Sequence, residues 1–462
     1  MFYAEGTHRW NFNMASHDYE FSRQYYSDTA FYFLTSGANR AALMGEYAQP
    51  ADNPSYTTGS YDFNYRYENE QVNIINSGRE WYQQVASGVR TTTDPQVKDV
   101  LTDENINYRI RVLARSASQV IFSLNQGSDP VVYLNPAPVD LADINGLYAS
   151  VAEKKGSVLP ASSTPVFNVV FNNNGNSSAT GYIDFEELKG RASLKYSAGQ
   201  LIFSDARSIS PSQVTRFNIE SQTDLNIWDV TDPDDLETVK ASRAGNICYF
   251  LAATDSLRKY VAFTTDNLLS PVMKGRIVAN QNLHAMGDAE MIIVTHPLFM
   301  AQAKRLAAIH ENNDNIRSVI VTPGQIYNEF SGGIPDAAAI RNFVKMIWEK
   351  GKTTGVPLKY LLLFGDGSYE NKTPPPGNTN FIPTWQSVNS NTGVLSFTSD
   401  DFYGLLEDGE GESNGSLEVG IGRFPVDDTT SAGLMVRKVR NYISSAAFGS
   451  WRNVVCMLAD DE

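Results

Sequence analysis

The chain has 462 residues, of which 42% are hydrophobic and 11% aromatic, and this supply of apolar side chains excludes a globally disordered protein. A formal net charge of −15 at pH 7 argues against nucleic acid as a partner, because such binding relies on Lys and Arg to neutralise phosphates. With only two cysteines, Cys248 and Cys456, the chain is neither a disulfide-stapled scaffold nor a cysteine-rich zinc module. No apolar run reaches the ~20 residues of a membrane helix, and no signal peptide opens the sequence.

Residues 1–285 carry the pattern of a β-rich amino-terminal module. Short apolar or aromatic runs such as Val120–Leu124 alternate with polar turns such as Asn172–Asn176. Many short strands between polar turns predict a sandwich or barrel-like fold, which we expect to comprise one or two subdomains. Helical interruptions are predicted near residues 71–89 and 141–153.

From about residue 286 the pattern changes to alternating strands and helices. Continuous apolar runs such as Met291–Val294 are typical of strands that are covered on both faces. The alternation predicts an open, mostly parallel sheet with helices on both sides over residues 286–462. The predicted strands are 291–294, 319–321, 360–364, 417–424 and 454–458, and the predicted helices are 297–311, 336–350 and 429–446.

Acidic residues mark the places where chemistry is expected in such a sheet. Function in open α/β sheets concentrates at the carboxyl ends of the strands. Asp366 follows one predicted strand, and residues 460–462 follow the last one. An acidic loop over 407–412 leads to Glu418, and crowded oxygen ligands beside glycines favour Ca²⁺, although a solvated acidic turn explains this loop equally well.

The cysteines and histidines do not form a visible nucleophile pair. Cys248 and Cys456 both lie inside apolar runs, which predicts buried structural thiols. His310 falls on the apolar face of a predicted helix, and His296 precedes a proline as a helix cap would. Activation of a thiol or hydroxyl needs a base within hydrogen-bond reach, and no such pair can be argued from these residues. Residues 365–368 lack the Lys of a phosphate-binding loop.

Several segments in a fixed order resemble the gingipain-type cysteine peptidases, which have a caspase-like α/β fold. Each segment is weak alone, but their order and spacing are specific together. Two further segments, Phe2–Trp10 and Asn226–Asp232, extend the resemblance over most of the chain. The carrying segments are Met291–Pro297, Thr322–Phe330, Ala339–Phe343, Tyr360–Asp366, Ser399–Gly404 and Ile421–Pro425.

The resemblance implies roles for some acidic residues and implies that the catalytic pair is absent. The nucleophilic Cys and the His of the family's Gly-His-Gly context have no counterpart here, so we expect the first half of a catalytic domain, inactive by itself. Either Asp461 or Glu462 matches the acid that orients the imidazole. Asp366 and Glu418 match ligands of structural calcium, and Asp408 is a weaker match.

Within the family the chain is most similar to the sortase-like subgroup of the type IX secretion system. That similarity implies a cell-surface enzyme on the outer membrane of a Gram-negative bacterium. Its implied partners are secreted cargo proteins with a carboxy-terminal targeting domain, an outer-membrane β-barrel protein, and surface lipopolysaccharide as acceptor. The implied chemistry is acyl transfer through a thioester. The alternative is a non-catalytic surface protein whose β module recognises a partner or a glycan.

Overall fold

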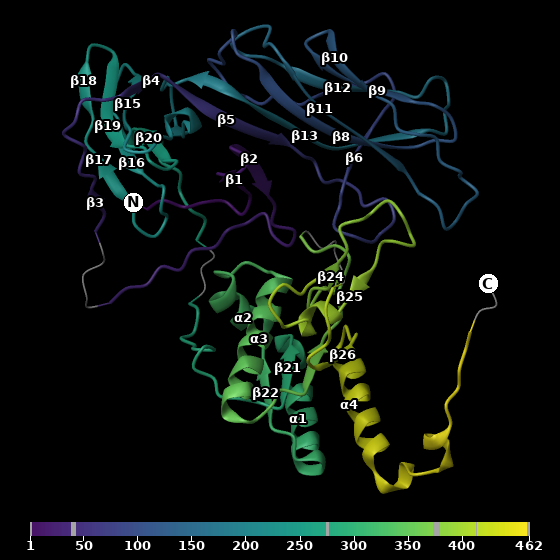
Figure 1. Cartoon of the computed structure of the whole chain (residues 1–462). Helices are drawn as coiled ribbons and strands as arrows, with labels where there is room; N and C mark the ends of the chain where they lie inside the picture. Colours follow the sequence, from purple (N-terminus) through teal and green to yellow (C-terminus); the bar gives the residue numbers. More distant parts are fainter. Residues whose placement is uncertain (1, 38–42, 274–276, 373–378, 413, 460–462) are drawn as a thin grey trace. The chain divides into compact units, whose positions relative to one another are not determined.

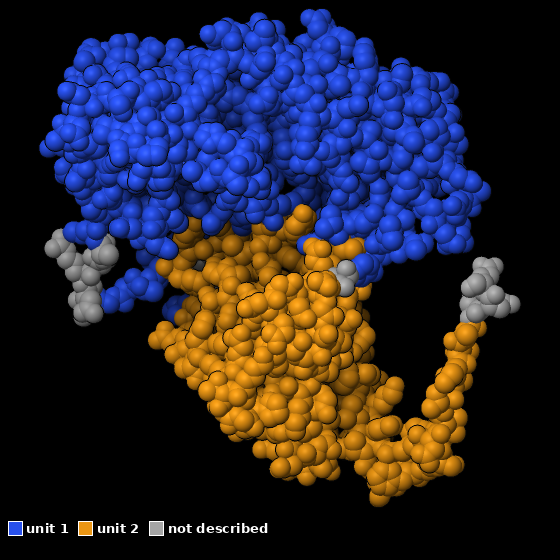
Figure 2. Space-filling model, in the orientation of Figure 1, with its two compact units in different colours: residues 1–23, 34–277, 388–397 blue, residues 24–33, 278–387, 398–462 orange. Residues whose placement is uncertain are grey.

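The chain folds into two compact units, which we describe from a computed structural model. The structure describes residues 2–37, 43–273, 277–372, 379–412 and 414–459. Unit 1 contains residues 1–23, 34–277 and 388–397, and unit 2 contains residues 24–33, 278–387 and 398–462 (Figure 2). The units are therefore not two uninterrupted stretches, because each includes a short segment that is separated in sequence from the rest of it.

Unit 1 contains a first β sandwich with a large apolar core. Apolar side chains from both of its sheets, such as Phe122 and Ile110, are fully buried between them. One sheet has the order β10-β9-β12-β7 and the other β11-β8-β13-β5, with β6 also paired to β13. The strands are β5 (Ser60–Tyr67), β6 (Gln83–Val85), β7 (Arg90–Thr92), β8 (Ile106–Arg115), β9 (Ile121–Gln126), β10 (Asp129–Leu134), β11 (Ser150–Val158), β12 (Phe167–Asn172) and β13 (Thr180–Ser193).

A second, smaller sandwich and a hairpin complete unit 1. The sheets β14-β20-β16-β17-β3 and β18-β19-β15-β4 enclose an aromatic core in which Phe217, Phe250 and Tyr260 are in ring contact. The strands are β1 (Arg9–Asn13) and β2 (Asp18–Ser22) of the hairpin, and β3 (Gly45–Glu46), β4 (Tyr56–Thr58), β14 (Gln200–Phe203), β15 (Val214–Glu220), β16 (Asn226–Asp229), β17 (Glu237–Val239), β18 (Ser242–Ala244), β19 (Ile247–Ala253) and β20 (Tyr260–Phe263) of the sandwich. The predicted β-rich amino-terminal region is confirmed.

Unit 2 is built on a four-stranded parallel sheet in the order β22-β21-β23-β26. Its strands are β21 (Met291–Thr295), β22 (Ser318–Val321), β23 (Tyr360–Phe364) and β26 (Gly420–Phe424). A short antiparallel pair, β24 (Trp385–Gln386) and β25 (Thr398–Ser399), lies in the long connection between β23 and β26.

Helices cover both faces of this sheet, as the alternating pattern predicts (Figure 1). The helices are α1 (Met300–Asp314), α2 (Pro323–Phe330), α3 (Ala337–Thr354) and α4 (Thr429–Ile443). Helices α2 and α3 share a core with Ile292 and Leu361, whereas α1 and α4 share one with Ile293 and Leu362. Neighbouring residues of a strand point to opposite faces, so α2 and α3 lie on one side and α1 and α4 on the other.

Helix α2 was not predicted, although its start signal is present in the sequence. Thr322 caps the helix by accepting from the Gln325 N–H, and the Gln325 side-chain oxygen accepts in turn from the Thr322 N–H. This is a capping box with Pro323 at the first helical position. At eight residues the helix is too short to show a clear apolar period.

The two helices predicted inside unit 1 are wrong. Residues 71–89 contain β6 and a bridge between Val72 and Tyr82. Asn73 in this stretch bonds the backbone of Ser77 and Gly78 through its side chain, a local arrangement that competes with a helix. Residues 141–153 are a loop followed by the start of β11, and the Asp143 side chain makes a turn by accepting from the Asn145 N–H.

The strand predicted at 454–458 is also wrong, and so is the prediction that Cys456 is buried. The segment follows a short 3₁₀ turn and pairs with no strand among the described residues. Its side chains are exposed, from 71% at Val454 to 96% at Leu458. An apolar, β-branched run becomes a strand only where a neighbouring strand takes its hydrogen bonds and covers its side chains.

The two cysteines are free thiols, and of the two Cys248 is buried as expected. No helix in the described part of the chain has the length and apolarity needed to cross a membrane.

Candidate functional site

The strand order of unit 2 creates a switch point between β21 and β23. The chain passes from β21 to its neighbour β22 on one side, and then crosses to β23 on the other side of β21. Loops that leave the carboxyl ends of β21 and β23 therefore diverge, and ligands in open α/β sheets bind in the crevice that forms there. His296 directly follows β21, and Gly365 and Asp366 follow β23. These residues form the candidate functional edge.

His296 is held as a rigid, neutral ring at this edge. Its Nδ1 accepts from the Leu298 N–H at 3.3 Å, so the proton of the neutral ring lies on Nε2. The ring centroid lies 4.6 Å from that of Phe381 and 6.2 Å from that of Phe299. Partial burial lowers the pKa of His296 below its usual value, so the imidazole is uncharged at pH 7. The predicted capping role is confirmed.

Asp366 is fixed through both its backbone and its side chain. Its carbonyl oxygen accepts from the N–H groups of Phe381 and Ile382 at 3.0 and 3.1 Å. Its carboxylate accepts from the Thr379 hydroxyl at 3.1 Å. Phe381 therefore joins the two halves of the edge, because its backbone bonds Asp366 while its ring packs on His296.

Arg423, near the end of β26, clamps the loops behind Asp366. Its guanidinium makes two bonds of 2.7 Å to the two carboxylate oxygens of Asp400. It also donates to the carbonyl oxygens of Gly365 and Ile382, each at 3.0 Å, and of Pro383 at 3.3 Å. Burial lowers the pKa of Arg423, but the carboxylate of Asp400 outweighs it and raises the pKa overall. Arg423 and Asp400 lie in two of the segments that carry the family resemblance, but no local sequence pattern indicates that they pair.

The three carboxylates predicted to bind calcium do not share one site. Asp366 follows the carboxyl end of β23, whereas Glu418 precedes the amino end of the parallel strand β26. With about 3.3 Å of rise per residue, they lie roughly 20 Å or more apart. Glu418 accepts from the Leu406 N–H at 2.7 Å, and Asp408 is exposed and paired with Lys345 at 2.5 Å. Within the described ranges, no group of three or more His, Cys, Asp or Glu side chains could hold a metal ion. Calcium binding stays a prediction from the family resemblance.

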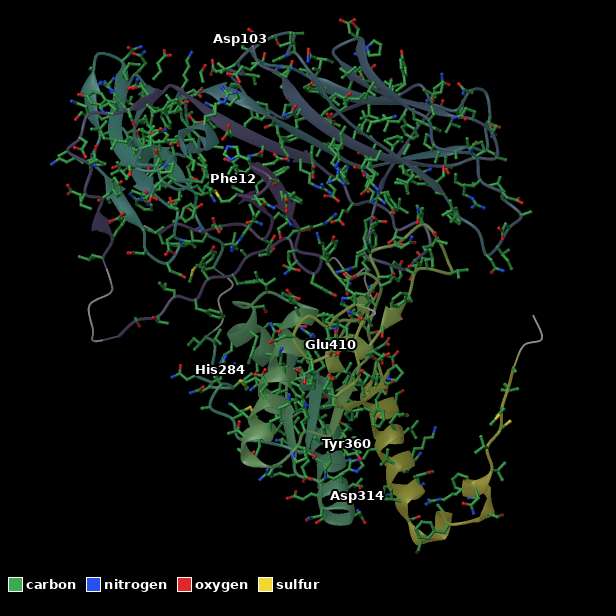
Figure 3. All side chains as sticks on the ribbon, in the orientation of Figure 1. Phe12, Asp103, His284, Asp314, Tyr360 and Glu410 are labelled. Carbon is green, nitrogen blue, oxygen red and sulfur yellow. The ribbon has the colours of Figure 1, made fainter. Side chains whose placement is uncertain are left out.

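Cationic side chains of α3 bind the acidic loop over residues 407–412. Arg341 donates to the carbonyl oxygens of Leu405 and Glu410 at 2.6 and 3.0 Å. Lys352 pairs with Glu407 at 3.2 Å. Glu410, which Figure 3 labels, folds back on its own loop and accepts from the Ser416 N–H at 3.0 Å. The loop is thus held by cations on one face of a helix, because Arg341, Lys345 and Lys352 follow one another at spacings of about one and two turns.

Asp461 and Glu462, the predicted orienting acids, lie outside the described residues. Cys248 lies in β19 of unit 1, where its thiol contacts Arg243 and the Thr223 carbonyl. Among the described residues no hydrogen bond joins a cysteine to a histidine. The candidate functional edge therefore contains no Cys–His pair among the described residues.

Comparison with known proteins gives this edge a context. No curated protein matches the chain. The model of peptidase family C25 matches residues 284–462. The crystal structure of dimeric latent PorU from Porphyromonas gingivalis is similar to 99% of this chain, with a TM-score of 0.80 and 23% identity. The chain spans 45% of the length of that protein.

Two gingipain structures resemble smaller parts of the chain. The complex of the pro- and mature domains of RgpB from Porphyromonas gingivalis is 20% identical over 33% of this chain and 29% of that chain, with a TM-score of 0.22. The Arg-specific cysteine proteinase gingipain R is 20% identical over 35% of this chain and 30% of that chain, with a TM-score of 0.23. Over 99% of its length the chain has the fold of the corresponding part of PorU, and residues 284–462 are a domain of peptidase family C25.

Proposed function

We propose that this chain is part of a cell-surface cysteine peptidase that removes the carboxy-terminal targeting domain of secreted cargo and transfers the new end to an amine of surface lipopolysaccharide. One observation carries the proposal: the peptidase family C25 domain stands in a chain that has the PorU fold over 99% of its length. Because the chain spans 45% of PorU, the nucleophile and the base are assigned to residues outside these 462.

The proposed reaction has two steps. A cysteine thiolate attacks the carbonyl carbon of the scissile peptide bond, the C–N bond breaks, and the departing amine takes a proton from the histidine. An acceptor amine then attacks the thioester, its proton passes to the histidine, and the thiolate leaves. Water in place of the amine gives simple hydrolysis. Asp461 or Glu462 would orient the imidazole through a hydrogen bond.

In this proposal the residues of the candidate edge position the substrate. His296 presents an Nε2–H donor beside an aromatic ring, and Asp366 presents a carboxylate fixed at the carboxyl end of β23. A donor and an acceptor fixed in this way suit an extended peptide backbone. The sandwiches of unit 1 would bind cargo or the outer-membrane β-barrel partner.

The test uses the natural full-length protein that carries this sequence. It is incubated with a reporter that ends in a cargo targeting domain and with an amine acceptor, and products are identified by mass spectrometry. We expect cleavage with transfer, and loss of both when the cysteine whose alkylation by iodoacetamide stops the reaction is replaced by Ala. Cys456→Ser serves as the control and should stay active. Binding of the reporter without cleavage would instead support the non-catalytic surface protein.

A further inference from the structure

Glu186 is a carboxyl group in the core of the first sandwich. In register it lies opposite Ile110 of β8 and Tyr67 of β5, so these three side chains point to the same face of the sheet. Leu188, two residues further along β13, also points to this face and belongs to the apolar core. Glu186 is 0% exposed. Its side chain therefore lies between the two sheets, among aliphatic and aromatic groups.

Neither carboxyl oxygen of Glu186 has a hydrogen-bond partner among the described residues. The polar group that acts on Glu186 is Thr93, which follows β7 of the facing sheet and is itself fully buried, and it lowers the pKa of Glu186 by less than burial raises it. The Thr93 hydroxyl also lacks a partner, so the two groups are near one another without the geometry of a hydrogen bond. A buried carboxylate without a cation or donors is strongly disfavoured, and such a group takes up a proton instead.

The surroundings of Glu186 offer no compensating charge. The titratable groups whose side chains point to this face are Tyr61, Tyr65 and Tyr67 of β5, Tyr108 of β8 and Lys154 of β11. Lys154 is the cation among them, but it is exposed and lies two strands away from Glu186. Asp94 after β7 is an acid. The strands β8, β9 and β12 contribute apolar side chains to the same core. Glu187 makes the contrast clear, because it points to the other face and pairs with Arg66 and, at 3.7 Å, with Arg109. Two adjacent glutamates of one strand thus have opposite electrostatic environments.

We propose that the first sandwich takes up a proton at Glu186 when it folds, and that the sandwich loses stability as the pH rises because the unfolded chain no longer binds this proton. Burial raises the pKa of Glu186 from 4.5 to about 8. Between these two values the unfolded chain has released the proton while the folded sandwich keeps it. The unfolding constant therefore rises about tenfold for each pH unit across this window and levels off above it. This inference does not depend on the proposed enzymatic activity.

The test compares hydrogen exchange in the full chain and its variants at matched pH values. Protection is followed in peptides from β8 and β12, and Glu186→Gln removes the titration while it keeps the size of the side chain. The ratio of opening constants, wild type over Glu186→Gln, should rise about tenfold per pH unit from pH ~5 to ~8. Glu187→Gln is the matched control, which should lower protection at every pH and keep the wild-type slope.

Two further measurements keep the result decisive. The infrared band of a protonated carboxyl group should be present at pH 7 in the wild type and reduced in Glu186→Gln. If the buried amide prevents folding, Glu186→Leu replaces it and should show the same flat pH profile. A wild-type slope in Glu186→Gln or Glu186→Leu, or no loss of the infrared band, overturns the proposal.

Discussion

At the scale of single residues, Arg423 joins two segments that carry the family resemblance, because it forms an ion pair with Asp400 of the other segment. An arginine has five N–H donors, and Arg423 places one on each of five acceptors. The Asp400 carboxylate takes two of them in a fork-like pair, and three backbone carbonyls take the others. A buried arginine used in this way cannot be exchanged for lysine, whose ammonium group is a point charge with three donors.

We predict that Arg423→Lys destabilises unit 2 by about 1–3 kcal/mol, because at least two buried acceptors lose their donors. Thermal unfolding followed through Trp385 and Trp348 fluorescence measures the effect. Arg437→Lys on the exposed side of α4 is the control and should leave stability unchanged. Equal stability of both variants would show that the clamp is dispensable.

A second residue, Glu329 at the end of α2, gives unit 2 an acid-sensitive anchor. It accepts from the N–H of Leu283 at 2.7 Å and from Gln281 Nε2 at 2.7 Å, and it contacts His284 Nδ1 at 2.8 Å. His284 is labelled in Figure 3. Partial burial raises the pKa of Glu329, but these donors outweigh it and hold the pKa at about 2.

We predict that this anchor stabilises unit 2 at neutral pH and that the contribution disappears as the pH falls from about 4.5 towards 2. The folded state holds the carboxylate charged while the unfolded chain binds a proton, so stability is lost on acidification. Glu329→Gln should cost about 1–3 kcal/mol at pH 7 and little below pH ~3. Urea unfolding at several pH values measures this, and a cost that does not vary with pH would contradict it.

At the scale of elements, the helices of unit 2 contain two glycines in opposite situations. In α3, a Cβ at Gly351 would lie 2.5 Å from the Val356 carbonyl oxygen, so the chain beyond the helix approaches its backbone closely. In α4, a Cβ at Gly433 would meet no atom within 4 Å. Only the first glycine has a packing reason to be there.

We therefore predict opposite signs for the same substitution. Gly351→Ala should destabilise unit 2 by about 1–3 kcal/mol through the forced shift of segment 356–358. Gly433→Ala should stabilise it by about 0.5–1 kcal/mol, because alanine lowers the entropy cost of helix formation. Thermal unfolding of the two variants side by side checks this, and the same sign for both would refute the packing argument.

The sequence predicts elements well where one regular pattern decides them and poorly where tertiary contacts do. The apolar runs of β21 and β23 and the Asp336 cap of α3 are visible without a structure. Residues 454–458 have the composition of a strand, but the neighbour that would make them one cannot be seen in a local pattern. The Arg423–Asp400 pair and the cations of α3 over the acidic loop escaped prediction for the same reason, since each joins residues far apart in sequence.

At the scale of the whole molecule, each unit contains a short segment that is separated in sequence from the rest of it, residues 24–33 in unit 2 and residues 388–397 in unit 1. Specific contacts hold each segment inside its unit. Tyr26 of segment 24–33 is buried in the core of unit 2, and Gln24 bonds Asp336 at 2.9 Å. Segment 388–397 bonds the body of unit 1, where the Tyr148 N–H donates to the Asn391 carbonyl at 2.8 Å and the Glu80 N–H to Ser390 Oγ at 2.9 Å.

We predict that Gly78→Ala releases segment 388–397 from unit 1. Gly78 has a φ of +80°, and a Cβ there would lie 2.1 Å from the Asn389 carbonyl oxygen. Gly88→Ala is a matched control, because its φ of +75° imposes similar strain but its Cβ meets nothing within 4 Å. Hydrogen exchange in peptides over 388–397 should increase in Gly78→Ala and stay at the wild-type rate in Gly88→Ala. Unchanged exchange in both would show that this close approach does not hold the segment.

Because each unit contains a segment from elsewhere in the sequence, the protein cannot be divided at a single point, either in the laboratory or by recombination between genes. A single cut after residue 277 would leave the carboxy-terminal piece without Tyr26, a member of its core, and the amino-terminal piece without residues 388–397. Neither piece would be a complete folding unit. Separate expression of unit 2 requires residues 24–33 to be supplied again, either as an added peptide or through a permuted chain. Gene fusions that swap the β unit between relatives must carry the ten residues of 388–397 with it.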